Sequence, residues 1–236
     1  MTSPVFSSFV LPCGITLPNR LAKAAMEENM ADAGQIPGAV LLRLYKRWAA
    51  GGTGLLITGN VMVDGRAMTG PGGVVLDKHS DIAPFEAWAR VAKQNNTRVV
   101  MQLNHPGRQV YAAMGGDVLS PSDVALDLGK HSHLFSKPRA MTQQDIEQLI
   151  QRFADSAVKA EQAGFDGVQI HAAHGYLISQ FLSPLTNQRK DEYGGSIESR
   201  MRLLIEVIKA IREQVSATFI VAVKINSADF QRGGFD

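Results

Sequence analysis

Short apolar runs alternate with longer stretches of helical spacing along most of this chain. The apolar runs at residues 54–58, 98–103, 167–171 and 219–226 predict buried strands, and residues 21–25 predict a weaker one. The stretches between them place apolar residues three and four positions apart, which predicts amphipathic helices. A chain that alternates strands and helices in this way forms a parallel sheet, open or closed, and we expect a single domain.

The predicted helices have distinct apolar faces. Pro37 is expected to open the first helix, because a missing N–H costs nothing in the first turn, and Val40, Leu44 and Trp48 form its apolar face. The later helices have apolar faces made of Phe85, Trp88, Ala89 and Ala92, then of Ile146, Leu149, Ile150, Phe153, Ala157 and Val158, and finally of Ile197, Met201, Leu204, Ile208, Ile211 and Val215.

The segment 105–140 has no helical period and is rich in glycine and proline. It is too long for an ordinary connection, so we expect a capping insertion over the functional site. A helix resumes after it, because Thr142 and Asp145 have the spacing of a capping box, and Ser196 is placed to cap a later helix. Residues 9–17 are expected to form a short hairpin that covers the floor of a barrel.

Three polar residues fall on the same predicted face of the sheet. Side chains alternate across a strand, so Gln102, His171 and Lys224 each lie on a mixed face, while the opposite, wholly apolar face should meet the helices. We expect these three side chains to converge at the mouth formed by the strand C-termini. A buried lysine is costly unless an anionic or electron-rich group meets it, so a ligand of that kind is its natural partner.

His171, His174 and Tyr176 stand where the strand at 167–171 stops. Two imidazoles and a phenol in such a place can hold a developing oxyanion and deliver a proton. Taken alone, the histidines favour a structural role over catalysis. Gln102 could serve only to hydrogen-bond a neighbouring strand, and Lys224 could lie on the surface if the strand alternation is shifted by one residue. No carboxylate falls at a familiar zinc spacing, so we expect no metal.

Composition narrows the classes of partner. The chain has 236 residues and a net charge of +2, which is too small to predict binding to nucleic acid or to an anionic membrane. Its apolar runs stay below the roughly 20 residues of a membrane span, and Met1–Pro4 does not begin a secretion signal. Cys13 is the only cysteine, which fits a cytoplasmic protein.

Several longer motifs together resemble the Old Yellow Enzyme family of flavin oxidoreductases. The matching segments are Asn19-Arg20-Leu21-Ala22-Lys23-Ala24-Ala25-Met26, Ile57-Thr58-Gly59-Asn60, Met101-Gln102-Leu103-Asn104-His105-Pro106-Gly107-Arg108, Ile170 to Tyr176, Phe181-Leu182-Ser183-Pro184-Leu185-Thr186-Asn187, Arg189 to Arg202, and Lys224-Ile225-Asn226-Ser227-Ala228-Asp229-Phe230. Each segment is a weak signal, but the combination is specific.

The resemblance implies a (β/α)8 TIM barrel that binds FMN at its C-terminal mouth. A nicotinamide nucleotide, NADH or NADPH, would reduce the flavin, which would then reduce the activated C=C bond of an unsaturated carbonyl compound. By position, the cofactor-binding residues would be Ala24, Ala25, Met26, Gly59, Gln102 and Lys224. Gly59 would leave room for the edge of the ring, Gln102 would bond its pyrimidine part, and Lys224 would face its N1 and O2 atoms.

The resemblance also assigns the catalytic residues. His171 and His174 would hold the substrate carbonyl oxygen, and Tyr176 would protonate the carbon opposite the hydride. Three positions depart from the family pattern: Ala25 replaces a proline, Glu27 replaces a threonine or cysteine, and Lys224 replaces the commoner arginine, which keeps the charge but loses the planar fork. A carboxylate at Glu27 would disfavour negative charge on the flavin.

The chain is short for this family. A TIM barrel needs eight strands, and only about five can be placed. We therefore expect residues 1–236 to be the N-terminal part of one FMN-binding barrel domain that lacks the last strands. An inactive or partner-dependent fragment, and a flavin-free barrel lyase or isomerase, remain the alternatives. Further partners would be a second copy of the chain or the missing barrel portion.

Overall fold

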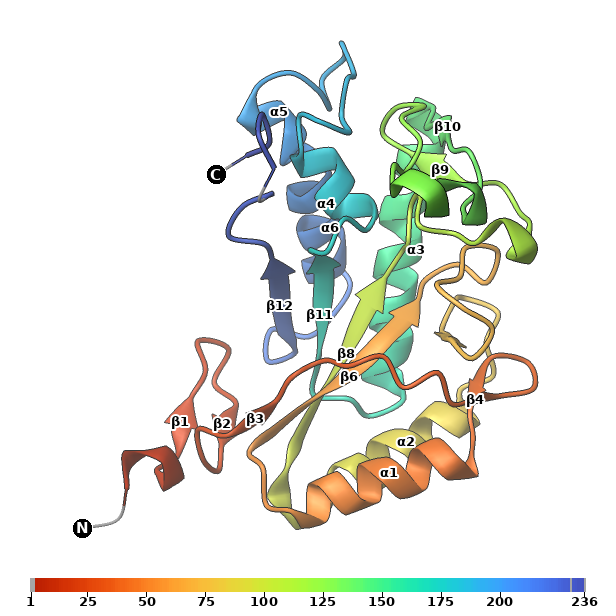
Figure 1. The fold of residues 1–236 in the computed structure, drawn as a ribbon. Coiled ribbons are helices and arrows are strands. Elements are labelled where there is room, and N and C mark those ends of the chain that lie inside the picture. Colours follow the sequence, from red (N-terminus) through yellow and green to blue (C-terminus); the bar gives the residue numbers. More distant parts are fainter. Residues whose placement is uncertain (1–2, 230, 236) are drawn as a thin grey trace.

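The computed structural model describes residues 3–229 and 231–235 of the chain. Its centre is a parallel sheet in the order β12-β11-β8-β6-β3, with β7 paired to β6. Figure 1 shows β12, β11, β8 and β6 side by side, with α3 (Gln143–Gln162) and α6 (Arg202–Arg212) behind them. The strands are β3 (Ala22–Lys23), β6 (Leu55–Met62), β7 (Val74–Val75), β8 (Arg98–Asn104), β11 (Gly167–Ala172) and β12 (Ile220–Ile225).

Helices connect the central strands as the alternating pattern predicts. They are α1 (Ala39–Ala50), α2 (Ala83–Ala92), α3 (Gln143–Gln162), α4 (Leu177–Leu182), α5 (Ile197–Arg200) and α6 (Arg202–Arg212). The smaller strands are β1 (Phe9–Val10), β2 (Thr16–Leu17), β4 (Ala31–Asp32), β5 (Ile36–Pro37), β9 (Leu119–Ser120) and β10 (Arg139–Ala140). Short 3-10 helices are η1 (Pro4–Phe6), η2 (Gln94–Asn96), η3 (Ala112–Met114) and η4 (Gly129–Leu134).

The core lies between the sheet and its helices. The predicted apolar face of α2 is confirmed, because Phe85, Trp88, Ala89 and Ala92 are all buried. The capping box of α3 is confirmed as well, since Thr142 accepts a hydrogen bond from the backbone of residue 145 and its own N–H is bonded in return. The hairpin predicted at 9–17 is present as the antiparallel pair β1–β2.

The prediction for the first helix was wrong in its start and its buried face. Pro37 belongs to β5, where it pairs with Ala31, and α1 begins after Gly38. The buried residues of α1 are Leu41, Tyr45 and Ala49, one position later than predicted. The predicted and the observed residues form adjacent rows with the same spacing, so the spacing alone does not decide which row is buried. Trp48 lies at the edge of the core, where Lys23 Nζ stands 4.2 Å from the centre of its indole ring.

The last predicted helix is divided into two. Ser196 caps α5, as predicted, but the helix ends at Met201 and α6 starts anew. The second part buries Leu203, Leu204, Val207 and Ile211, whereas Ile197 and Met201 are exposed. The sequence therefore predicted the cap correctly and the start of the buried stripe incorrectly.

The segment 105–140 folds over the C-terminal ends of β6 and β8, as Figure 1 shows at the upper right. It contains η3, η4 and the parallel pair β9–β10. Arg139 joins this segment to the start of α3, because its guanidinium donates to Asp117 at 2.8 Å and to Asp145 at 2.7 Å. The segment is thus anchored at its base by a charged network.

The β12 edge of the sheet is open. Val223 and Ile225 lie on the outer face of β12 and are 36% and 55% exposed. These residues belong to the apolar face that was expected to meet helices, and in residues 3–229 and 231–235 that face is only partly covered. Within the same residues, no helix has the length and apolar character to cross a membrane.

Candidate functional site

Three aromatic side chains gather at the C-terminal end of β11. The ring of His171 lies 5.0 Å from that of His174 and 4.9 Å from that of Tyr176, centre to centre, and both pairs are edge-to-face. His171 is the last but one residue of β11 and is 3% exposed. His174 is exposed and Tyr176 is half-buried in the turn that leads to α4. The arrangement brings two imidazole rings and a phenol ring into contact at the mouth of the strand.

The strand register brings the other polar residues to the same face. Lys224 of β12 is the direct neighbour of His171, and Gln102 of β8 is the neighbour of Gln169. Gln169 and His171 are two positions apart on β11, so they share a face. The structure therefore places Gln102, His171 and Lys224 on one side of the sheet. Lys224 is half-buried at the edge strand.

His171 is held as a neutral hydrogen-bond donor. The N–H of Ala173 donates to its Nδ1 at 3.2 Å, so the ring proton belongs on Nε2. Burial, followed by the charges of His174 and Lys224, lowers the pKa of His171 to about 3. Burial and Lys224 also lower the pKa of His174. Both rings are consequently uncharged near neutral pH.

Tyr176 keeps its proton over a wide pH range. Burial raises the pKa of Tyr176 to about 12, and the charges of Glu27 and Tyr111 act in the same direction. A phenol with this pKa stays protonated near neutral pH, and it gives up its proton only to a group that becomes strongly basic during the reaction.

Gln102 makes the strand-to-strand hydrogen bond that was the alternative to a ligand role. Its Nε2 donates to Gln169 Oε1 at 2.8 Å, and its backbone N–H donates to Thr58 Oγ1 at 2.9 Å. The side chain is only 2% exposed. Gln102 is thus fixed in place by both neighbouring strands.

A β-bulge in β6 adds a residue that the sequence analysis missed. The register between β6 and β8 shifts between Ile57 and Asn60, so that Asn60 stands opposite Gln102. Asn60 Oδ1 and Asn104 Oδ1 are buried acceptors without a hydrogen bond in the described part of the chain. The glycine inside this strand was a signal for the bulge, because an isolated glycine within a strand often marks one.

The segment from Ala24 to Met30 crosses β6 at the bulge. Ala24 and Met26 are exposed and Ala25 is half-buried. A side chain at Gly59 would collide with the Met26 carbonyl oxygen and with the Glu28 carboxylate. The absence of a side chain at Gly59 therefore allows the segment that contains Met26 and Glu28 to pass close to β6.

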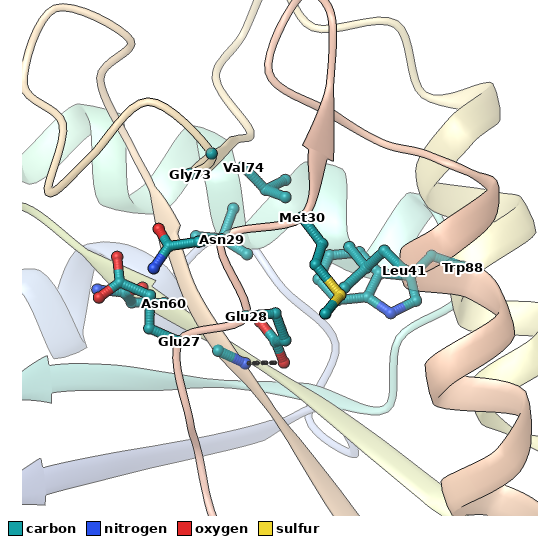
Figure 2. Close-up of a pocket in the computed structure, with 12 residues that line it drawn as sticks. Glu27, Glu28, Asn29, Met30, Leu41, Asn60, Gly73, Val74 and Trp88 are labelled. Carbon is teal, nitrogen blue, oxygen red and sulfur yellow. Dashed lines mark hydrogen bonds between the residues drawn. The ribbon is translucent and has the colours of Figure 1, made fainter.

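Glu28 fastens this segment to the barrel wall. Its Oε1 accepts from the N–H of Gly59 at 3.1 Å, the bond drawn in Figure 2, and from the hydroxyl of Tyr45. Lys23 Nζ lies 3.7 Å from the same carboxylate oxygen and donates to the Ile57 carbonyl at 3.1 Å. The pocket of Figure 2 lies beside this segment and is lined by Glu28, Leu41 and Asn60, among others.

Among residues 3–229 and 231–235, no three His, Cys, Asp or Glu side chains are grouped so that they could hold a metal ion. The chemistry available at the β11 mouth is therefore that of neutral imidazoles, a phenol, an ammonium group and amides. Such a set can bind an oxyanion and transfer a proton.

The chain belongs to the NADH:flavin oxidoreductase / NADH oxidase family, whose sequence model matches residues 6–234. It is 42% identical over 235 residues to the NADH-dependent flavin oxidoreductase iliE of Hypocrea jecorina, covering 93% of this chain and 59% of that protein. It is 35% identical to an NADPH dehydrogenase of Clostridium acetobutylicum, covering 98% of this chain and 66% of the relative. The chain thus spans about three fifths of the length of such relatives.

Solved structures agree with the fold. An old yellow enzyme homologue from Zymomonas mobilis superimposes with a TM-score of 0.88 at 28% identity, covering 98% of this chain and 66% of the other. Morphinone reductase in complex with tetrahydroNAD gives a TM-score of 0.86 at 26% identity, covering 95% of this chain and 64% of the other. The observed sheet is accordingly an incomplete (β/α)8 barrel, as predicted.

Proposed function

We propose that this chain carries the flavin and substrate-activating part of an FMN-dependent oxidoreductase that uses NADH or NADPH to reduce activated C=C bonds. The observation that carries this proposal is the cluster of His171, His174 and Tyr176, with Lys224 beside it and Gln102 on the same face. Relatives named as NADH-dependent flavin oxidoreductase and NADPH dehydrogenase support both the flavin and the choice of nicotinamide nucleotide.

The residues present fit a flavin ring. Asn60 Oδ1 and Asn104 Oδ1 are buried acceptors that need a donor, and the imide N–H of a flavin is one. Lys224 would stabilise negative charge on the ring, and Gln102 would line its polar edge. Bound FMN would supply hydride transfer from the nicotinamide to the alkene.

The segment that crosses the bulge would border the ring. Ala24, Ala25 and Met26 carry small or flexible side chains at the open surface beside Gly59. In this proposal they contact the flavin through backbone and side chain, and Gly59 acts indirectly because it lets the segment approach the strand. Glu27 follows them, and its charge contributes to the raised pKa of Tyr176.

The substrate would be an unsaturated carbonyl compound. His171, with its proton on Nε2, donates to the carbonyl oxygen, and His174 lies close enough to share it. Both imidazoles are neutral, so they polarise the carbonyl by hydrogen bonding and withdraw electrons from the double bond. Tyr176, protonated at all physiological pH values, gives its proton to the substrate carbon.

The first test is the colour of the purified protein. A protein that binds FMN absorbs at about 450 nm, a property of the cofactor, and should oxidise NADH or NADPH faster when an α,β-unsaturated ketone is added. A colourless protein that refuses added FMN would overturn the proposal. A colourless protein with lyase or isomerase activity would instead favour flavin-free chemistry at the same histidines.

The open β12 edge favours a second candidate, a chain that works only together with further barrel strands. Val223 and Ile225 expose apolar surface on the strand that carries Lys224. In this proposal these strands come from a second copy of the chain or from the missing barrel portion. Measuring molecular mass and FMN binding across protein concentration tests this candidate, because a monomer that binds FMN tightly contradicts it.

We also propose a cytoplasmic location, where NADH and NADPH are supplied.

A further inference from the structure

His174 and Tyr176 belong to one tight turn with an uncommon backbone. His174 has φ of 59° and Gly175 has φ of 71°, so two successive residues are left-handed. The N–H of Tyr176 donates to the Ala173 carbonyl at 3.2 Å and closes the turn. Positive φ at both central residues is typical of a type I′ turn, which favours Asn, Asp or Gly. A histidine in this conformation is unfavourable and needs support from its surroundings.

Side chains bond every backbone polar group of the two central residues. Within α4, Ser179 Oγ accepts from the N–H of Gly175 at 3.3 Å, and Gln180 Nε2 donates to its carbonyl at 2.7 Å. These two contacts are local in the sequence. The turn is therefore attached firmly to the helix that follows it.

The bonds to His174 come from distant parts of the chain. Asn226 Oδ1 accepts from the N–H of His174 at 3.1 Å, and Gln109 Nε2 donates to its carbonyl oxygen at 2.8 Å. Asn226 follows β12, and Gln109 follows β8. The segments that follow the two neighbours of β11 thus hydrogen-bond the N–H and the carbonyl of His174 from opposite sides.

We propose that Gln109 and Asn226 are positioning residues that hold His174 in its left-handed conformation and so place the rings of His174 and Tyr176 against a bound carbonyl group. This inference rests on the proposed function. Neither side chain need touch the substrate. Without either bond the turn can relax toward ordinary φ values, which moves the His174 ring away from His171 and loosens Tyr176, whose N–H closes the turn.

The test uses 4-hydroxybenzaldehyde, a phenol whose oxygen resembles the substrate oxyanion, with calorimetry on the full chain loaded with FMN. Asn226→Ala and Gln109→Glu should each weaken its affinity about tenfold, because the first removes the acceptor and the second replaces the donor by an acceptor. Asn226→Asp keeps an acceptor and Gln109→Lys keeps a donor, so both should stay within about threefold of the parent. Gln151→Ala, an amide truncation on the exposed side of α3, is the control.

Amide hydrogen exchange at His174 and Tyr176 gives a second readout that needs no ligand. Exchange should speed up at least tenfold in Asn226→Ala and Gln109→Glu and stay slow in the two conservative variants. If affinity and exchange are unchanged in the disruptive variants, the positioning proposal is wrong even where the enzyme is active. If the parent protein does not bind the phenol, the proposed function fails, and the exchange comparison still decides the positioning roles. If Asn226→Ala does not fold, the pair Gln109→Glu and Gln109→Lys decides alone.

Discussion

Replacing His105 by asparagine should remove part of the acid sensitivity of the fold. His105 follows β8, is 3% exposed, and accepts from the N–H of Gly107 at 3.1 Å through Nδ1. Burial lowers the pKa of His105 to about 4, although the charge of Asp64 opposes the shift. The unfolded chain binds a proton at this ring below about pH 6.5. Unfolding therefore takes up a proton between pH 6.5 and 4, and stability is lost as the pH falls through this window.

The size of the effect follows from the two pKa values. At pH 5 the unfolded ring is almost fully protonated and the native ring is almost fully neutral. At about 1.4 kcal/mol per pKa unit, this one group lowers the free energy of unfolding by about 2 kcal/mol between pH 7 and pH 5. His171, whose pKa is lowered to about 3, adds a loss of similar size in the same direction. The parent protein should thus lose about 4 kcal/mol from these two rings.

The measurement is urea unfolding followed by tryptophan fluorescence at pH 7 and at pH 5. His105→Asn keeps an acceptor for the Gly107 N–H and carries no titrating group, so its loss between the two pH values should be about 2 kcal/mol smaller than that of the parent. A constant destabilisation from the smaller side chain cancels in this difference. His131→Asn, at an exposed position of η4, is the control and should change nothing. A variant that loses as much stability as the parent would refute the reasoning.

Three further outcomes are expected. Tyr176→Phe should slow alkene reduction by about 10²–10⁴-fold while flavin reduction by NADH stays nearly unchanged, and equal losses in stopped-flow measurements of both half-reactions would remove its role as proton donor. Lys224→Met should lower the reduction potential of bound FMN in a spectroelectrochemical titration, because it removes the cation that stabilises negative charge on the ring, and an unchanged potential would place Lys224 outside the site. Thr142→Ala should lower the free energy of unfolding by about 1 kcal/mol in urea titration, since it removes the cap of α3, and no change would mean that Asp145 caps alone.

Much of the fold could be predicted because it depends on local periodicity. The strands β6, β8, β11 and β12 follow from apolar runs bounded by turn residues, and the buried face of α2 follows from helical spacing. The capping box of Thr142 and Asp145 is likewise encoded within four residues. The shared face of Gln102, His171 and Lys224 could be predicted from alternation alone, because parallel strands keep their C-termini at one end.

The tertiary structure decided what depends on contacts between distant segments. The bulge places Asn60 opposite Gln102, and no local period encodes a register shift. Lys23 lies over the ring of Trp48 at the edge of the core, and the Glu28 carboxylate occupies the space beside Gly59. The left-handed turn at His174 is held by Gln109 and Asn226, which are 65 and 52 residues away in the chain. Sequence periodicity determines which face of an element a side chain occupies. Which distant groups pack together, and which of them form hydrogen bonds, is determined only by the tertiary structure.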